Sequence, residues 1–281
     1  GPARLTELTG LADLGVLPML RHDLPREEGA LTGGSLVALA PNAPRVVLPR
    51  LPYGSNLDEF RLLPSVAHVR WSVDPSDLDD LDPSRDRIVL PGSKHVVADF
   101  AWLQTVGFTR AIERAAGRGV PVIGVCGGAM MLGKTFHDPD GVEGARPTER
   151  PLEMLGLLDL HTEMLGSKQV TATEVRFTPE WVTSSGIVAS ASGYEIRFGD
   201  VHGDATVVGT GRSGPVAWAD GAVLATTVHG LFETPGVITT LIGPNAAGVD
   251  LDGALDATFD ALADAVDEHL DVSAILRLID A

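Results

Sequence analysis

One cysteine lies in a glycine-rich segment, Gly124-Val125-Cys126-Gly127-Gly128, between a short apolar run and the helix-forming residues 129–132. A nucleophile placed on a sharp turn between a strand and a helix needs small neighbours of this kind. The helix N-terminus favours the thiolate, and the following amide, at Gly127, is positioned to hold an oxyanion. A buried structural cysteine is the alternative. The pattern favours Cys126 as a nucleophile.

A cysteine nucleophile needs a base, and the chain has eight histidines. His229 follows the apolar run 222–228 and precedes a glycine, as expected at a strand end where such sites assemble. His95 is a second candidate, because it ends another strand-and-turn segment at Pro91-Gly92-Ser93-Lys94. That turn could supply a second oxyanion amide, from Gly92 or Ser93. No spacing of His, Cys, Asp and Glu indicates a metal site.

Two further motifs overlap or follow the cysteine. Residues 128–135 match the formal pattern of a phosphate-binding loop with Lys134, but their middle residues are strong helix formers. Residues 209–214 match a dinucleotide fingerprint, yet a strand and not a helix follows them. We therefore expect a helix at the first motif and a hairpin turn at the second. A nucleotide-binding site predicts that Lys134, and not Cys126, is essential.

The elements that must position these residues alternate between strands and helices in the first half of the chain. This alternation predicts an α/β fold with a doubly wound, mostly parallel sheet. The strands are predicted at 45–48, 67–71, 87–90 and 120–125, and the helices at 56–63 and 96–116. After residue 150, short strands separated by turns predict an antiparallel extension, at 170–176, 193–199, 206–209, 215–219 and 222–228. A long amphipathic helix, with apolar residues from Leu255 to Leu270, ends the chain.

Composition excludes several classes of function. The 281 residues have 44% hydrophobic residues and a net charge of −17, which is ordinary for a globular protein but repels nucleic-acid backbones. No apolar run approaches the roughly 18–20 residues of a membrane-spanning helix, and no export leader is apparent. One cysteine allows no intrachain disulfide. We expect a cytoplasmic protein that binds neither nucleic acid nor membrane.

Seven motifs, in this order and spacing over about residues 45–235, resemble the class I glutamine amidotransferases. Within that class they resemble the C-terminal amidotransferase domain of the cobyric acid synthases. The motifs are Leu90-Pro-Gly-Ser-Lys94, Asp99-Phe-Ala-Trp-Leu103, Gly124-Val-Cys-Gly-Gly128, Met131-Leu-Gly133, Asp138-Pro-Asp-Gly-Val-Glu143, Ser192-Gly-Tyr-Glu-Ile196 and His229-Gly-Leu-Phe232.

The resemblance implies a flavodoxin-like sheet and a site for glutamine hydrolysis. Cys126 attacks the side-chain amide of glutamine, and His229 donates a proton to the departing ammonia and then activates water. The implied oxyanion amides lie at Gly92 and Gly127. The implied substrate-binding residues are Ser93, Gly128, Met130, Tyr194 and Glu195.

The sequence departs from the family pattern at three positions. Met130 stands where the family has a substrate-holding glutamine, and Arg197 replaces a usual histidine. Leu231 stands where many class I enzymes carry the third acid of the triad, as is typical of the cobyric acid synthase group. Glu233 is a possible substitute for that acid.

The resemblance also implies a domain organisation and a partner. Residues 1–40 resemble the end of a preceding ATP-dependent synthetase domain or a linker, and residues 41–281 form the amidotransferase domain. No cofactor is expected in this chain, because ATP and Mg²⁺ would bind the synthetase. Ammonia would then amidate carboxylates of a corrin precursor. A different carboxylate acceptor and a catalytically degenerate scaffold remain alternatives.

Overall fold

The computed structural model describes residues 1–19, 39–144, 147, 149–243 and 251–279. Contacts divide the chain into two units, residues 26–249 and a second unit of residues 1–25 with 250–281. This division differs from the predicted boundary at residue 40, since the C-terminal helices group with the N-terminal segment. The Asp271 amide donates to the Leu14 carbonyl at 2.8 Å, and Gly15 bridges Leu270. Most of residues 20–40, and the side chain of Leu255, lie outside the described residues.

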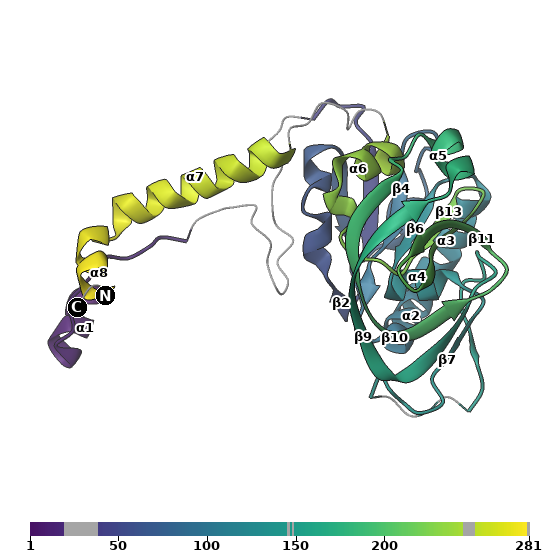
Figure 1. The fold of residues 1–281 in the computed structure, drawn as a ribbon, viewed down its shortest axis with the longest axis horizontal. Helices are drawn as coiled ribbons and strands as arrows, with labels where there is room; N and C mark the ends of the chain where they lie inside the picture. The colour runs from purple at the N-terminus through teal and green to yellow at the C-terminus, as the bar shows by residue number, and fades with distance from the viewer. Residues whose placement is uncertain (20–38, 145–146, 148, 244–250, 280–281) are drawn as a thin grey trace. The chain divides into compact units, whose positions relative to one another are not determined.

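One large sheet organises the unit of residues 26–249 (Figure 1). Its strand order is β3-β1-β4-β6-β13-β12-β11-β9-β7-β8, and β10 pairs with β9. A two-stranded sheet, β2-β5, stands apart. The strands are β1 (Arg45–Pro49), β2 (Gly54–Ser55), β3 (His68–Ser72), β4 (Arg87–Leu90), β5 (Gly92–Ser93), β6 (Val122–Val125), β7 (Thr135–His137), β8 (Leu152–Glu153), β9 (His161–Phe177), β10 (Ser190–His202), β11 (Thr206–Gly211), β12 (Gly214–Asp220) and β13 (Val223–Thr226).

The helices connect and cover these strands. The α-helices are α1 (Pro2–Thr9), α2 (Val96–Val106), α3 (Phe108–Gly117), α4 (Gly127–Leu132), α5 (Pro179–Ser185), α6 (Pro235–Ile242), α7 (Leu251–His269) and α8 (Val272–Ile279). The 3-10 turns are η1 (Leu57–Phe60), η2 (Leu63–Ser65), η3 (Pro75–Leu78) and η4 (Leu231–Glu233). None of the helices in the described part of the chain is long and apolar enough to cross a bilayer.

The predicted fold class is confirmed. Strands β3, β1, β4, β6 and β13 pair in parallel, and β1 lies between β3 and β4, the next two strands of this sheet along the chain. This is the strand order of flavodoxin-like sheets, in which sites form at the carboxyl ends of the strands. Strands β12, β11 and β9 continue the sheet in antiparallel fashion, as predicted.

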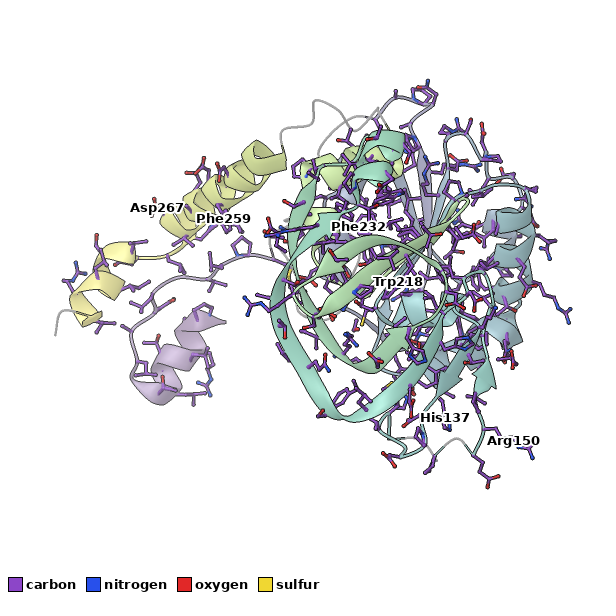
Figure 2. All side chains as sticks on the ribbon, turned by 45° about the vertical axis from the view of Figure 1, so that its right-hand side comes forward. His137, Arg150, Trp218, Phe232, Phe259 and Asp267 are labelled. Carbon is purple, nitrogen blue, oxygen red and sulfur yellow. The ribbon has the colours of Figure 1, made fainter. Side chains whose placement is uncertain are left out.

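Apolar side chains fill both faces of the sheet. One core contains residues of α2, α3 and α4, including Phe100, Phe108 and Met131. A second core lies among β9, β12, α5 and α6 and includes Val175 and Val237. Trp218 and Phe232 lie inside this unit, whereas Phe259 of α7 is 52% exposed (Figure 2).

Three predicted elements differ in detail. The helix predicted at 96–116 is two helices, because Gly107 adopts φ 99° and ends the first of them. The helix predicted at 56–63 is a pair of short 3-10 turns, and Pro64 lies in the second. The strand predicted at 222–228 is shorter, and it pairs in parallel with β6 as well as antiparallel with β12.

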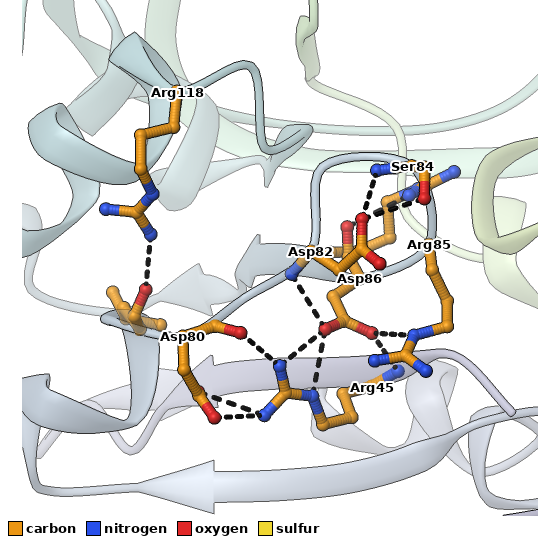
Figure 3. A network of polar contacts seen from close by, with 9 residues as sticks. Arg45, Asp80, Asp82, Ser84, Arg85, Asp86 and Arg118 are labelled. Atoms are coloured by element: carbon orange, nitrogen blue, oxygen red, sulfur yellow. Dashed lines mark hydrogen bonds and ion pairs between the residues drawn. The ribbon is translucent and has the colours of Figure 1, made fainter. Parts of the chain in front are cut away.

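An ion-pair network around the buried Asp86 ties together the amino ends of β1 and β4 (Figure 3). Asp86 is fully buried and accepts hydrogen bonds from the Arg45 backbone and side chain, the Arg85 side chain and the Asp82 amide. Burial raises the pKa of Asp86, but these hydrogen bonds outweigh it and lower the pKa to about 2. Asp86 is thus a stabilising carboxylate at the end of the strands opposite to Cys126.

Candidate active site

Cys126 occupies a strained turn between β6 and α4. Its backbone has φ 50° and ψ −106°, which a residue with a side chain adopts only when the surroundings impose it. The Cys126 amide donates to the Thr226 carbonyl of β13 at 2.7 Å. A Cβ at Gly128 would lie 2.1 Å from the Leu90 carbonyl, so the strand and the helix approach closely only because glycine is there. The predicted strand–turn–helix context is confirmed.

His229 lies beside the cysteine because β13 and β6 are parallel neighbours that end at the same edge. The His229 side chain is almost fully buried, and the neighbouring Cys126 side chain contributes to raising the pKa of His229. The Cys126 sulfur itself lies 3.6 Å from the Ile196 carbonyl, to which the thiol donates. Nδ1 of His229 donates to Oε1 of Glu59 at 2.9 Å, which leaves Nε2 for the sulfur. The structure therefore brings Cys126 and His229 together, as the sequence predicts.

Glu59 is the residue that the sequence analysis missed. It lies in η1, is 1% exposed, and its second oxygen accepts from the Gly230 amide at 3.0 Å. This carboxylate therefore binds both the ring of His229 and the backbone amide of the residue that follows it. A possible signal was its place among Asn56-Leu57-Asp58-Glu59, an acidic segment that follows the first strand at the site edge.

The charge of His229 follows from these contacts. Burial lowers the pKa of His229, but the interactions with Cys126 and Glu59 outweigh burial and raise it to about 10. His229 is therefore an imidazolium at neutral pH. An imidazolium beside the nucleophile can donate a proton to a leaving nitrogen.

Tyr194 packs over the imidazole. The centroids of the Tyr194 and His229 rings lie 5.5 Å apart, and the ring planes are inclined at 23°. The Tyr194 hydroxyl accepts a hydrogen bond from Nδ2 of Asn56 at 3.0 Å. The Tyr194 and His229 backbones exchange two hydrogen bonds, of 3.1 and 2.8 Å. A Cβ at Gly193 would lie 2.5 Å from the His229 carbonyl. Glycine at 193 thus allows β10 to approach the histidine.

The turn at Gly92 and Ser93 lies against both catalytic candidates. A Cβ at Gly92 would be 3.0 Å from Cε1 of His229, and a Cβ at Gly127 would be 2.7 Å from the Ser93 nitrogen. The Lys94 amide donates to the Tyr53 carbonyl, so in this antiparallel pair Gly92 faces Ser55 at a hydrogen-bonded position. Ser93 lies between these positions, and its amide is therefore directed away from β2 and adjoins Gly127.

The other predicted substrate-binding residues lie around this centre, and their roles stay predictions. Glu195 is buried and accepts from Nε of Arg197 at 2.7 Å and from the Thr227 hydroxyl at 3.3 Å. Met130 is 4% exposed and packs against Gly199. A Cβ at Gly199 would lie 2.7 Å from the methyl carbon of Met130. Gly128 is the second residue of α4, and the Ser93 hydroxyl donates to Asp99.

Three secondary expectations are corrected. The amide that adjoins Gly127 is that of Ser93 and not of the predicted Gly92, because Gly92 faces Ser55 at a hydrogen-bonded position of the small sheet. Glu233 does not orient His229, because it is partly exposed and pairs with Arg61 at 2.7 Å. His95 does not contact the sulfur; it packs on Tyr53 and faces Glu143 at 3.8 Å.

The helix predicted in place of a phosphate-binding loop is confirmed. The amides of residues 129–132 lie within α4, and Lys134 pairs with Asp159 at 2.8 Å. Residues 209–214 form the β11–β12 hairpin, as predicted. In the described ranges of the chain, no three His, Cys, Asp or Glu side chains are arranged to hold a metal ion.

Comparisons with known proteins agree with this geometry. Residues 45–237 match the model of the CobB/CobQ-like glutamine amidotransferase domain. The chain belongs to this family. The matched residues contain Cys126, His229 and Glu59, and so include all three members of this group.

Curated relatives extend the match to nearly the whole chain. The chain is similar to cobyric acid synthases of Deinococcus radiodurans (37% identical) and Variovorax paradoxus (38% identical), each over 99% of this chain and 56% of the relative. The cobyric acid synthase of Mycolicibacterium vanbaalenii is 37% identical over 98% of this chain and 53% of its own length. The chain thus spans little more than half the length of these relatives.

A solved structure supports the fold. A crystal structure described as a glutamine amidotransferase matches with a TM-score of 0.50 and 20% sequence identity. The match covers 73% of this chain and 99% of that one. At this identity the likeness shows the fold alone.

Proposed function

We propose that this chain is the glutamine-hydrolysing part of a cobyric acid synthase and that it supplies ammonia for an ATP-dependent amidation. The observation that carries this proposal is the grouping of Cys126, His229 and Glu59 at the carboxyl edge of the sheet, with the His229 ring hydrogen-bonded to Glu59. A nucleophile, an acid–base group and an orienting carboxylate in this order perform acyl transfer. A scaffold domain would not need the buried pair of His229 and Glu59, or a cysteine held in a strained backbone conformation.

The chemistry follows from the positions of these groups. The Cys126 thiolate attacks the side-chain carbonyl carbon of glutamine, and the oxygen takes the charge of the broken π bond. The amides of Gly127 and Ser93 stabilise that oxyanion. The imidazolium of His229 gives its proton to the amide nitrogen, and the C–N bond breaks to release ammonia. The neutral imidazole then takes a proton from water, which attacks the glutamyl thioester and releases glutamate and the thiolate.

The relatives' name and length support the remaining steps of the proposal. ATP and Mg²⁺ would bind a synthetase part, either fused or separate, which activates a corrin carboxylate for attack by the ammonia. No cofactor is assigned to the present chain. We place the protein in the cytoplasm, where ATP is available and a catalytic thiol stays reduced. A different carboxylate acceptor has no observation in its favour.

The test is glutamate release from glutamine by the chain, alone and with a synthetase part plus ATP. Cys126→Ser should abolish release, and His229→Ala should leave less than about 1% of it, as loss of a catalytic base does. Mass spectrometry of the wild type after rapid quenching should find a glutamyl adduct on Cys126. Wild-type protein that yields neither glutamate nor adduct, with the synthetase present, would refute the proposal.

A further inference from the structure

The carboxylate of Asp99 is fully buried in the first turn of α2, one turn behind the Gly92–Ser93 loop. Its Oδ2 accepts from the Ser93 hydroxyl at 2.6 Å, and its Oδ1 accepts from the Tyr53 amide at 2.9 Å. Tyr53 directly precedes β2, and Ser93 ends β5. One carboxylate therefore joins the two strands of the small sheet that borders the site.

These contacts fix Ser93 on several sides. Its hydroxyl donates to Asp99 and accepts from the His95 amide at 2.9 Å, so the hydroxyl acts both as a hydrogen-bond donor and as an acceptor. Asp99 is thus the acceptor that determines the rotamer of Ser93. The backbone of Lys94 is held by the Tyr53 carbonyl at 3.0 Å, on the strand that Asp99 also binds.

The helix itself does not need this carboxylate as a cap. The first amides of α2, at Val96 and Val97, donate to Glu143 at 2.9 and 3.2 Å. Glu143 comes from a different loop and does the work of an N-terminal cap. A buried charge is costly unless it is paired or well hydrogen-bonded. One contact of the Asp99 side chain goes to Ser93, in the loop beside the cysteine, and the other goes to Tyr53, next to the strand that pairs with that loop.

We propose that Asp99 is a positioning residue that holds the Ser93 amide against the Gly127 amide, so that both can bind the oxyanion formed on glutamine. The inference rests on the proposed glutaminase function. An oxyanion donor acts only within about 2.7–3.1 Å of the developing charge, and loss of one donor costs about 10²–10³ in kcat. Displacement by about 1 Å can cost about 10². Because the oxyanion forms only in the transition state, the loss falls on kcat and spares KM.

The experiment compares four variants of the whole chain with the wild type. Asp99→Asn has a single acceptor oxygen; with that oxygen on the Tyr53 amide, its NH₂ group faces the Ser93 hydroxyl, which then loses its acceptor. Ser93→Ala removes the other end of the same hydrogen bond and leaves Asp99 bonded to the Tyr53 amide. It therefore provides the test if Asp99→Asn does not fold. The double variant completes a mutant cycle. Glu143→Gln is the matched control, because it weakens a buried carboxylate contact to the same helix without touching Ser93.

We expect Asp99→Asn and Ser93→Ala each to lower kcat for glutamate release by about 10- to 100-fold, with KM changed by less than about threefold. The double variant should lose little more than the worse single variant, since both break one link. Glu143→Gln should lower the unfolding temperature and leave kcat within about twofold.

The outcomes separate the inference from the function on which it rests. A wild-type rate with Asp99→Asn, a change in KM alone, multiplying losses in the double variant, or an equal loss of kcat in Glu143→Gln would overturn the role of Asp99 while glutaminase activity stands. An inactive wild type would overturn the proposed function, and the role of Asp99 with it.

Discussion

Replacing Glu59 with glutamine tests whether the buried carboxylate keeps His229 protonated and oriented. The wild-type carboxylate accepts from Nδ1 of His229 and from the Gly230 amide. A glutamine has one oxygen, so its NH₂ group must meet one of these two donors. A hydrogen bond to a charged group is worth about 1.5–3 kcal/mol, and each 1.4 kcal/mol changes a pKa by one unit. The pKa of His229 should therefore fall by about one to two units.

The sign of the pH effect is specific. In the wild type the pKa of His229 is raised to about 10, so the imidazolium that protonates the departing amide nitrogen persists well above neutral pH. In Glu59→Gln the alkaline limb of the kcat profile should move down by one to two pH units. At pH 7.5 a pKa of about 8 to 9 still leaves most of His229 protonated, so a fall in kcat of about tenfold or more at that pH would come from the ring's orientation or tautomer.

The assay is glutamate release between pH 6 and 10.5 under saturating glutamine. Glu233→Gln is the matched control, because the same change is made to a partly exposed glutamate that pairs with Arg61. We expect its profile to match that of the wild type. A Glu59→Gln enzyme with unchanged kcat and an unchanged alkaline limb would refute the orientation of His229 by Glu59.

Three other substitutions test separate parts of the structure. Asp86→Asn should lower the free energy of unfolding by about 2 kcal/mol at pH 7, because a folded pKa of about 2 against 3.8 makes the carboxylate stabilising above pH 4. In urea unfolding, the difference in stability between wild type and variant should shrink as the pH falls from 4 to 2, and a difference that does not change with pH would contradict this role of Asp86. Gly193→Ala places a Cβ 2.5 Å from the His229 carbonyl and should reduce kcat by at least about tenfold in a folded protein, as circular dichroism can verify. Lys134→Ala breaks a surface pair with Asp159 and should leave glutamate release unchanged; a large loss would restore the nucleotide-binding alternative.

The predicted site residues that the structure brings together are those whose signal is local. Cys126 is flanked by the glycines that its strained turn requires, and these are adjacent in sequence. His229 ends an apolar strand and is followed by Gly230, which adopts φ 83°. The parallel sheet then brings the two strand ends together without any further information. Local pattern and topology were sufficient for this half of the site.

The residues that were missed depend on contacts distant in sequence. Glu59 and His229 are 170 positions apart, and no periodicity marks which of 38 acidic residues will meet a given histidine. The segment of Glu59 was predicted to be a helix, but Asn56 adopts φ 55° and the turn that follows is 3-10. A regular helix over 56–63 would direct Glu59 differently. The departure from helical geometry is what delivers the carboxylate.

The same packing explains why the acid does not come from position 231. Leu231 is 4% exposed and Phe232 is 1% exposed, so the turn after His229 directs these side chains into the apolar core. A carboxylate at residue 231 would be desolvated among apolar groups, away from an ion-pair partner. Phe232 instead packs on Phe60, with ring centroids 5.1 Å apart, and Phe60 directly follows Glu59. The apolar turn that replaces the usual acid thus holds η1 in place, and η1 supplies the acid from the opposite side of the histidine.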